Sequence, residues 1–380
     1  MFKVAMILED GRLAGPQVYI SLLANALKDK VNTTIVIPIE DSAETIYKLD
    51  QFGLQYKTLQ ITRISKNIRC MIQYLVLFIT ETAEIYNYFK RNKFDIIYVS
   101  GGSWQYKGLI AGKIARIKVI WHMNDTYIPY IFRIVFNILN NLADAFTFAS
   151  EKTRDYYLPM IKKTKIGYII PQPVDTSYFS NSSEIESEKI IKKNYNQLII
   201  GTIANINPIK GLEIFIKIVA RLNDFFDNLQ FIVVGPVFSS QKNYFDKLLN
   251  QINNHKLRNI KFVGQQQDIR PFLDEFDIFV CTSYNESGPM TLWEAMSMKK
   301  AVVTTNVGDV SKYVHSGFSG EVVNIGDLDT MTQKIKELIL DKDKRERYGE
   351  KARRIIQHKL DVSICADKHF KLFKRICKNR

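Results

Sequence analysis

The sequence predicts an α/β protein made of two doubly wound parallel-sheet domains. Short runs rich in Val, Ile and Phe alternate with longer helical patterns along all 380 residues, which is typical of parallel strands connected by helices. The runs are almost continuously apolar, as strands are when helices cover both faces of a sheet. The alternation occurs once in each half, and 380 residues are too many for one core.

Each half contains five expected strands. Those of the first half are 3–8, 33–38, 95–100, 118–123 and 145–150, and those of the second are 198–204, 231–236, 260–264, 277–283 and 301–307. The polar segment 181–197 follows two prolines in "PQPVDTSYF" and predicts the connection. We therefore expect domains at 1–175 and 190–360, with a helix at about 361–380 that packs back on the first domain.

The composition favours a reduced, cytoplasmic protein with anionic partners. A net charge of +14 favours nucleotides, nucleic acid or acidic lipid headgroups, and the four cysteines show no metal-type spacing. No apolar run reaches the roughly 20 residues of a membrane span; the nearest, 70–80, predicts a core-facing helix. Basic residues are dense only in 342–354 and 371–380, which fits a solvated helix face or attachment to a membrane surface.

Two glutamates lie eight positions apart in "YNESGPMTLWEAMSM" (284–298). The preceding run predicts a strand, so Glu286 lies in the loop at its carboxyl end and Glu294 in the helix that follows. Ligands of open parallel sheets bind beyond this edge. An ionised carboxylate accepts two donors, which matches the two hydroxyls of a diol. The alternative is that Glu294 only complements the helix dipole and that Glu286 is exposed.

The stretch "GTIANINPIKGLE" (201–213) adds a cation at the same edge. It predicts a strand, a turn and a helix, with Lys210 and Gly211 near the first helical turn. A lysine there suits a diphosphate, and the turn from Ser287 to Met290 offers backbone N–H groups to an anion. Together these groups fit a nucleotide-sugar.

With these motifs, the sequence resembles the glycosyltransferases of family 4. The resemblance rests on "ESGPMTLWEAMSMKKAVVTTNVGD", "IKG", "PQPVDTSYF", "ASEKTRDYYL" and "ILEDGRLAGPQVYISLLANAL", and it covers essentially the whole chain. It implies the GT-B fold, in which two Rossmann-like domains face each other across a cleft. It also implies retaining transfer of a sugar from a nucleotide donor, with no metal and no cofactor.

The resemblance implies roles for individual residues. Glu294 resembles the ribose-binding carboxylate, Glu286 the one that contacts the donor sugar, and Lys210 the diphosphate cation. His122, in "WHMNDT", resembles the active-site histidine. The remaining expected positions are the phosphate and acceptor loop at Ala14 and Gly15, and donor contacts at Asn205, Gly264, Ser287, Gly288, Pro289 and Met290.

Three positions depart from the family pattern. Asn205 stands where arginine is usual, so one phosphate cation is missing unless Arg12 or Arg270 supplies it. Pro289 replaces a glycine and removes one N–H donor. Ala14 replaces the first of a glycine pair and narrows the conformational freedom of that loop.

Other classes of protein fit less well. "EDGRLAG" lacks the G-x-G-x-x-G of nicotinamide dehydrogenases, and "GLIAGKI" is one residue short of a P-loop. Basic residues are not interleaved with aromatic ones on a nucleic-acid-binding module, so no nucleic-acid partner is expected. An epimerase or phosphorylase of the same fold, or a non-catalytic binding protein, stays open.

We therefore expect a cytoplasmic glycosyltransferase of surface polysaccharide biosynthesis, with an alternative location at the inner face of the cell membrane. Its donor would be UDP- or GDP-linked, and its acceptor a glycan or a lipid-linked saccharide. An anionic membrane surface is a further expected partner.

Overall fold

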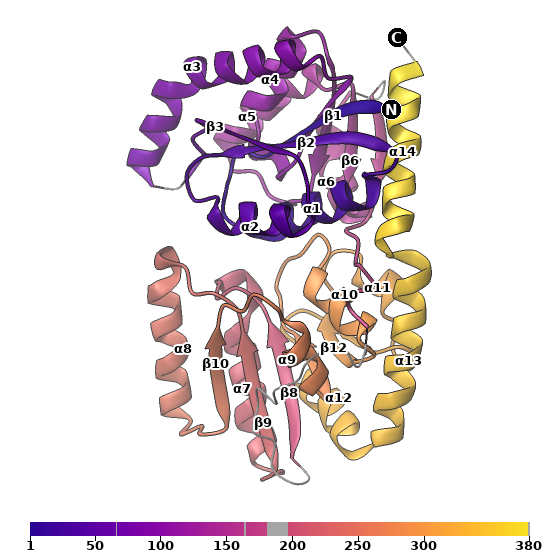
Figure 1. The fold of residues 1–380 in the computed structure, drawn as a ribbon. Helices are drawn as coiled ribbons and strands as arrows, with labels where there is room; N and C mark the ends of the chain where they lie inside the picture. The colour runs from indigo at the N-terminus through magenta and orange to yellow at the C-terminus, as the bar shows by residue number, and fades with distance from the viewer. Residues whose placement is uncertain (66, 163–164, 181–196, 379–380) are drawn as a thin grey trace. The chain divides into compact units, whose positions relative to one another are not determined.

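The computed structural model describes residues 1–65, 67–162, 165–180 and 197–378. The chain divides into two compact units, Met1–Pro173 with Val362–Arg380, and Val174–Asp361. The connection expected at 181–197 lies, except for Gln197, outside the described residues. Each unit contains a parallel sheet covered by helices (Figure 1).

The first unit has a seven-stranded sheet in the order β3-β2-β1-β4-β5-β6-β7. Its strands are β1 (Phe2–Ile7), β2 (Val31–Pro38), β3 (Tyr56–Leu59), β4 (Ile96–Val99), β5 (Lys118–Met123), β6 (Ala145–Phe148) and β7 (Ile166–Ile169). Its helices are α1 (Gly15–Leu27), α2 (Ala43–Gln51), α3 (Ile68–Asn92), α4 (Lys107–Ile114), α5 (Tyr130–Leu139), α6 (Glu151–Tyr157) and α14 (Val362–Lys378).

The second unit has a six-stranded sheet in the order β10-β9-β8-β11-β12-β13. Its strands are β8 (Leu198–Ile203), β9 (Leu229–Val234), β10 (Ile260–Gly264), β11 (Ile278–Cys281), β12 (Ala301–Thr305) and β13 (Glu321–Val323). Its helices are α7 (Leu212–Asn223), α8 (Lys242–Asn254), α9 (Arg270–Glu275), α10 (Met290–Ser297), α11 (Val310–Tyr313), α12 (Leu328–Leu340) and α13 (Lys342–Lys359). Strand order thus reverses at the first strand of each sheet, as in doubly wound folds.

The last helix, α14, belongs to the first unit and packs on α1. A buried polar cluster fixes it there. The Nε2 atom of His369 lies 2.9 Å from the hydroxyl of Tyr19 and 3.1 Å from that of Tyr98. Because buried polar groups are costly unless they are hydrogen-bonded, this cluster specifies where α14 docks.

Three strands, β3, β7 and β13, were not predicted from the sequence. Each lies at an edge of its sheet and has only three or four residues. An edge strand has a neighbour on one side only and is often short, so it need not carry the long apolar run that identified the other strands. All ten predicted strands are present, with ends that differ by a few residues.

The apolar run 70–80 is helical as predicted, because it forms the first half of α3. The prediction that it faces the core is wrong for more than half of its residues. Tyr74 is buried, but Ile72, Val76 and Ile79 are exposed. Apolar side chains therefore occupy both faces of this part of α3. No helix within the described ranges is long and apolar enough to cross a membrane.

Candidate functional site

Two loops meet at the carboxyl ends of β8 and β11, where the strand order of the second sheet reverses. One contains the 3₁₀ turn η4 (Pro208–Lys210) and the other leads into α10. The Tyr284 N–H donates to the carbonyl of Ile209 at 2.8 Å, and the Thr282 hydroxyl donates to the carbonyl of Lys210 at 3.0 Å. These bonds hold Lys210 beside the loop that carries Glu286.

Lys210 and Glu286 form an ion pair in a small recess. The Ser283 hydroxyl donates to the same carboxylate oxygen of Glu286 at 2.9 Å, and the Thr291 hydroxyl ties the start of α10 to the carbonyl of Ile203 at 2.9 Å. Burial lowers the pKa of Lys210, but Glu286 outweighs it and the net shift is upward. The ammonium group is therefore held charged, as diphosphate binding requires.

Gly308 supports the loop of Glu286 from behind. Its φ is +53°, and a Cβ atom built on it would lie 2.5 Å from the carbonyl oxygen of Ser287 and 2.8 Å from that of Glu286. Real Cβ atoms do not approach so closely, so a side chain at residue 308 would displace the loop. The backbone of Gly308 thus sets the position of Glu286.

Glu294 is buried in α10 but does not line the recess of Lys210 and Glu286. Its surroundings include Tyr178, whose pKa is raised by burial and further by the carboxylates of Asp268 and Glu294, while Arg270 opposes the shift. Arg270 stacks on the Tyr178 ring, with its guanidinium carbon 3.8 Å from the ring centre, and it binds Asp268 through both carboxylate oxygens. Glu294 therefore belongs to a second polar cluster of the same unit.

The other expected donor contacts lie at the same edge of the sheet. Asn205 follows β8 and is partly buried, whereas Gly264 ends β10 with φ +73° and open space around it. Pro289 is the residue before the first turn of α10, which begins at Met290; Ser287 and Gly288 precede it. Their contacts with a donor stay predictions. Arg270 is held by Asp268, and Arg12, in the first unit, by Asp10.

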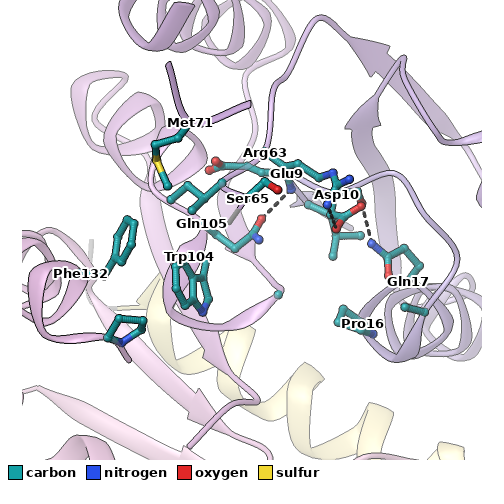
Figure 2. A pocket seen from close by; sticks show the side chains of 15 residues that line it. Glu9, Asp10, Pro16, Gln17, Arg63, Ser65, Met71, Trp104, Gln105 and Phe132 are labelled. Carbon is teal, nitrogen blue, oxygen red and sulfur yellow. Dashed lines mark hydrogen bonds and ion pairs between the residues drawn. The ribbon is translucent and has the colours of Figure 1, made fainter. Parts of the chain in front are cut away.

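The first unit contains a cavity of about 410 Å³ at the carboxyl ends of its strands. Figure 2 shows its two sides: Met71, Trp104 and Phe132 form an apolar wall, and Asp10 with Gln17 lies opposite. The Gln17 side chain donates to the Asp10 carbonyl at 2.5 Å. A cavity with one apolar and one polar side suits a molecule that has both characters.

Glu9 follows β1 and lies in the wall of this cavity. Its carboxylate reaches the first turn of α4. Its carboxylate accepts the Lys107 N–H at 2.7 Å and the Gly108 N–H at 3.4 Å. Burial nevertheless raises the pKa of Glu9 to about 7, against the lowering effects of Lys107 and these hydrogen bonds. Below it, the Lys107 ammonium is fully buried against Glu81 and donates to the Thr62 carbonyl at 2.7 Å.

Ala14 and Gly15 border this cavity as the start of α1. Ala14 lines it and precedes the first turn of α1, with φ −149°. An L-residue adopts this extended backbone without strain, so the predicted restriction by alanine costs nothing here. A Cβ atom on Gly15 would meet open space. The contact of this loop with phosphate or acceptor stays a prediction.

His122 lies in the core of the first unit rather than at a ligand-facing surface. It is fully buried, it stacks on Tyr19 with ring centres 4.6 Å apart, and its Nδ1 atom lies 3.0 Å from the Thr147 hydroxyl. Burial and the nearby His369 lower its pKa to about 3. A neutral, buried imidazole fits a packing role, and a part for His122 in catalysis stays a prediction.

Sequence reasoning missed several groups at these sites. Ser283 and Thr291 fix the loop of Glu286, and Tyr178 stacks with Arg270 and senses the charge of Glu294. Ser283 ends an expected strand and could have been named from that position. Tyr178 lies more than 100 residues before Glu294, so no local spacing relates them.

Two parallel α/β units with polar residues at the carboxyl ends of their strands define a protein of the GT-B fold. Among solved structures, a glycosyltransferase from Rickettsia africae aligns with 100% of this chain and 99% of its own, with a TM-score of 0.82 and 21% identity. Anabaena Alr3699/HepE in complex with UDP-glucose aligns with 99% and 100%, with a TM-score of 0.83 and 19% identity.

The chain belongs to glycosyltransferase family 4. The sequence model described as "Glycosyltransferase Family 4" matches residues 13–178, and that described as "Glycosyl transferases group 1" matches 183–355. A Campylobacter jejuni relative, N,N'-diacetylbacillosaminyl-diphospho-undecaprenol alpha-1,3-N-acetylgalactosaminyltransferase, is 23% identical over 94% of this chain and 95% of its own. A Staphylococcus aureus relative, capsular polysaccharide biosynthesis glycosyltransferase CapM, is 25% identical over 53% of each chain.

Substitution of Gly308 tests how the loop of Glu286 is held. We expect Gly308→Ala to lower the free energy of unfolding more than Gly317→Ala, by about 1–3 kcal/mol, because it adds a clash. Both glycines have positive φ, but nothing lies within 4 Å of a Cβ atom at Gly317, so that variant isolates the backbone cost. Urea denaturation measures the free energy of unfolding of both variants. Equal losses of stability would show that the loop of Glu286 moves aside without cost.

The pKa of Glu9 predicts a dependence of stability on pH. Since burial raises this pKa from 4.5 to about 7, Glu9 contributes stability that is present below pH 4.5 and lost as the pH rises to about 7. Between pH 5.5 and 8, the wild type should lose roughly 2 kcal/mol relative to Glu9→Gln. Urea denaturation at several pH values, with the exposed Glu84→Gln as control, tests this; parallel curves for wild type and Glu9→Gln would contradict it.

Proposed function

We propose that the protein transfers a sugar from a nucleotide-sugar to a glycan or lipid-linked saccharide with retention of configuration and without a metal ion. The observation that carries this is the ion pair of Lys210 and Glu286 at the point where the strand order reverses. A cation and a carboxylate held together there offer one group to a diphosphate and one to sugar hydroxyls.

The reaction develops charge that these groups match. Cleavage of the bond between the anomeric carbon and the phosphate oxygen leaves negative charge on the nucleoside diphosphate and positive charge on the sugar. Lys210 and the N-terminus of α10 would stabilise the first, and Glu286 the second. The acceptor hydroxyl would attack from the face of the departing phosphate, whose oxygen takes the proton. Donor binding would replace Glu286 by the diphosphate as the partner of Lys210.

The acceptor and the cell location follow from the first unit and from the relatives. A cavity with an apolar and a polar side fits a saccharide attached to a lipid, and the C. jejuni relative carries "diphospho-undecaprenol" in its name. We propose a UDP-linked donor before a GDP-linked one, since the Anabaena structures contain UDP. The product would enter a surface polysaccharide at the inner face of the cell membrane.

Calorimetric titration with UDP- and GDP-sugars tests the donor site. We expect Lys210→Ala and Glu294→Ala each to weaken binding about tenfold or more, because each removes a charged partner of the ligand. Lys299 and Glu350 form a surface ion pair of 2.7 Å in the same unit, and Lys299→Ala and Glu350→Ala should stay within about twofold of wild type.

Unchanged affinity in both site variants would overturn the assignment. Product analysis separates the reaction classes. Interconversion of donors with no acceptor present would indicate an epimerase, dependence on inorganic phosphate a phosphorylase, and binding without any turnover a non-catalytic protein.

A further inference from the structure

The first half of α3 exposes a row of large apolar side chains. Ile68, Ile72, Leu75, Val76 and Ile79 are each more than half exposed. Their spacing of three and four residues places them on one helical face, which we call the α3 face. The opposite face carries Tyr74 and Phe78, which pack inward. The α3 face is therefore separate from the buried face that stabilises the fold.

Helix α5 repeats this arrangement. Tyr130, Ile131, Ile134 and Ile138 are exposed and form the α5 face, whereas Phe136 is fully buried. Soluble proteins rarely expose contiguous apolar surface of this kind unless it binds a partner.

The charges on these two faces have a single sign. The stretches 68–80 and 130–139 contain two charged residues that are exposed, Arg69 and Arg133, and no exposed acidic residue. Two acidic residues follow in α3: Glu81 is buried against Lys107, and Glu84 is exposed beyond the five apolar residues of the α3 face. Apolar surface with only cationic charge complements an anionic lipid surface, whose headgroups attract arginine while its acyl region accepts isoleucine and leucine.

The two helices that carry these faces also line the same cavity. Met71 of α3 and Phe132 of α5 both line it, together with Trp104, whose ring centre lies 4.6 Å from that of Phe132 (Figure 2). Each helix thus has apolar side chains both in the cavity wall and on its exposed face. A lipid-linked molecule in the cavity would have its apolar part against the two helices that carry these faces.

We propose that the α3 face and the α5 face form a docking surface for an anionic lipid bilayer, so that the cavity lies at the membrane surface. This deepens the proposed function, since it rests on an acceptor attached to a lipid. Both helices would lie in the headgroup region with their apolar side chains toward the acyl chains, as interfacial helices do.

Three cations of the basic stretch in α13 have partners within their own unit. Lys344 contacts Glu337 and Glu321. Arg345 donates to the carbonyls of Leu338 and Ile339, and Arg353 to those of Phe179 and Ser297. These cations stabilise their own unit, and attachment to a membrane through 342–354 and 371–380 stays a prediction.

Flotation with vesicles of phosphatidylglycerol and phosphatidylcholine tests the proposal on the full chain. The wild type should float, and the triple variant Ile72→Gln, Leu75→Gln, Ile79→Gln should bind ~10-fold or more weakly. The double variant Arg69→Gln, Arg133→Gln should lose about fivefold for each arginine. The matched control Leu249→Gln, Ile325→Gln, Leu340→Gln alters exposed apolar residues of the second unit and should float like the wild type.

Tryptophan fluorescence gives a second readout that needs no change to the two faces. The chain has three tryptophans; Trp121 and Trp293 are buried, and Trp104 lines the cavity beside Phe132 of α5. Vesicles that contain brominated phosphatidylcholine should quench the emission, and Trp104→Phe should remove most of the quenching. Absence of quenching, or equal quenching in Trp104→Phe, would contradict docking through this surface.

Three outcomes would overturn the proposal: a wild type that does not float, a triple variant that floats like it, or a dimer that the triple variant abolishes without any vesicle binding. The last would assign the faces to a second copy of the chain. Donor titration without vesicles keeps the two proposals apart. The triple variant should bind the nucleotide-sugar as tightly as the wild type does. A wild type that does not bind the nucleotide-sugar would contradict the proposed function rather than the docking surface.

Discussion

The parallel direction of the strands is the constraint on which both sites depend. Every strand pairing described within the two sheets is parallel, so the loops that follow the strands gather at one edge of each sheet. In the second unit this brings together residues 210 and 286, and in the first it assembles the cavity beside Glu9. Helices that begin at this edge add N–H groups, which favour anions. The topology of the chain thus determines where its functional residues gather.

Electrostatics then differ between the two sites. Lys210 faces a recess, and Glu286 keeps its ammonium group charged. Lys107 is fully buried with Glu81. Removal of either partner would leave an uncompensated charge in the interior, which strongly destabilises a fold. The first lysine is therefore suited to exchange partners, and the second to hold the wall of the cavity in one arrangement.

The sequence was informative where a function depends on neighbours in the chain. Glu286 and Lys210 each follow a recognisable central strand, so their common edge could be predicted, as could all central strands. Edge strands such as β13 lack a long apolar run and were missed. Burial of His122 depends on Tyr19, Tyr98 and α14, and the link between Tyr178 and Glu294 spans more than 100 residues, so only the folded chain shows either. The run 70–80 looked like core because apolar content alone does not tell which side of a helix is covered.

The central claim is that Lys210 and Glu286 hold the diphosphate and the sugar of the donor. A crystal structure of the protein with a non-hydrolysable UDP-sugar tests it most directly. The account predicts a diphosphate oxygen about 2.8 Å from the Lys210 ammonium and a sugar hydroxyl that donates to the Glu286 carboxylate. A bound donor with the ion pair of Lys210 and Glu286 intact, and no ligand atom in contact with either side chain, would contradict it.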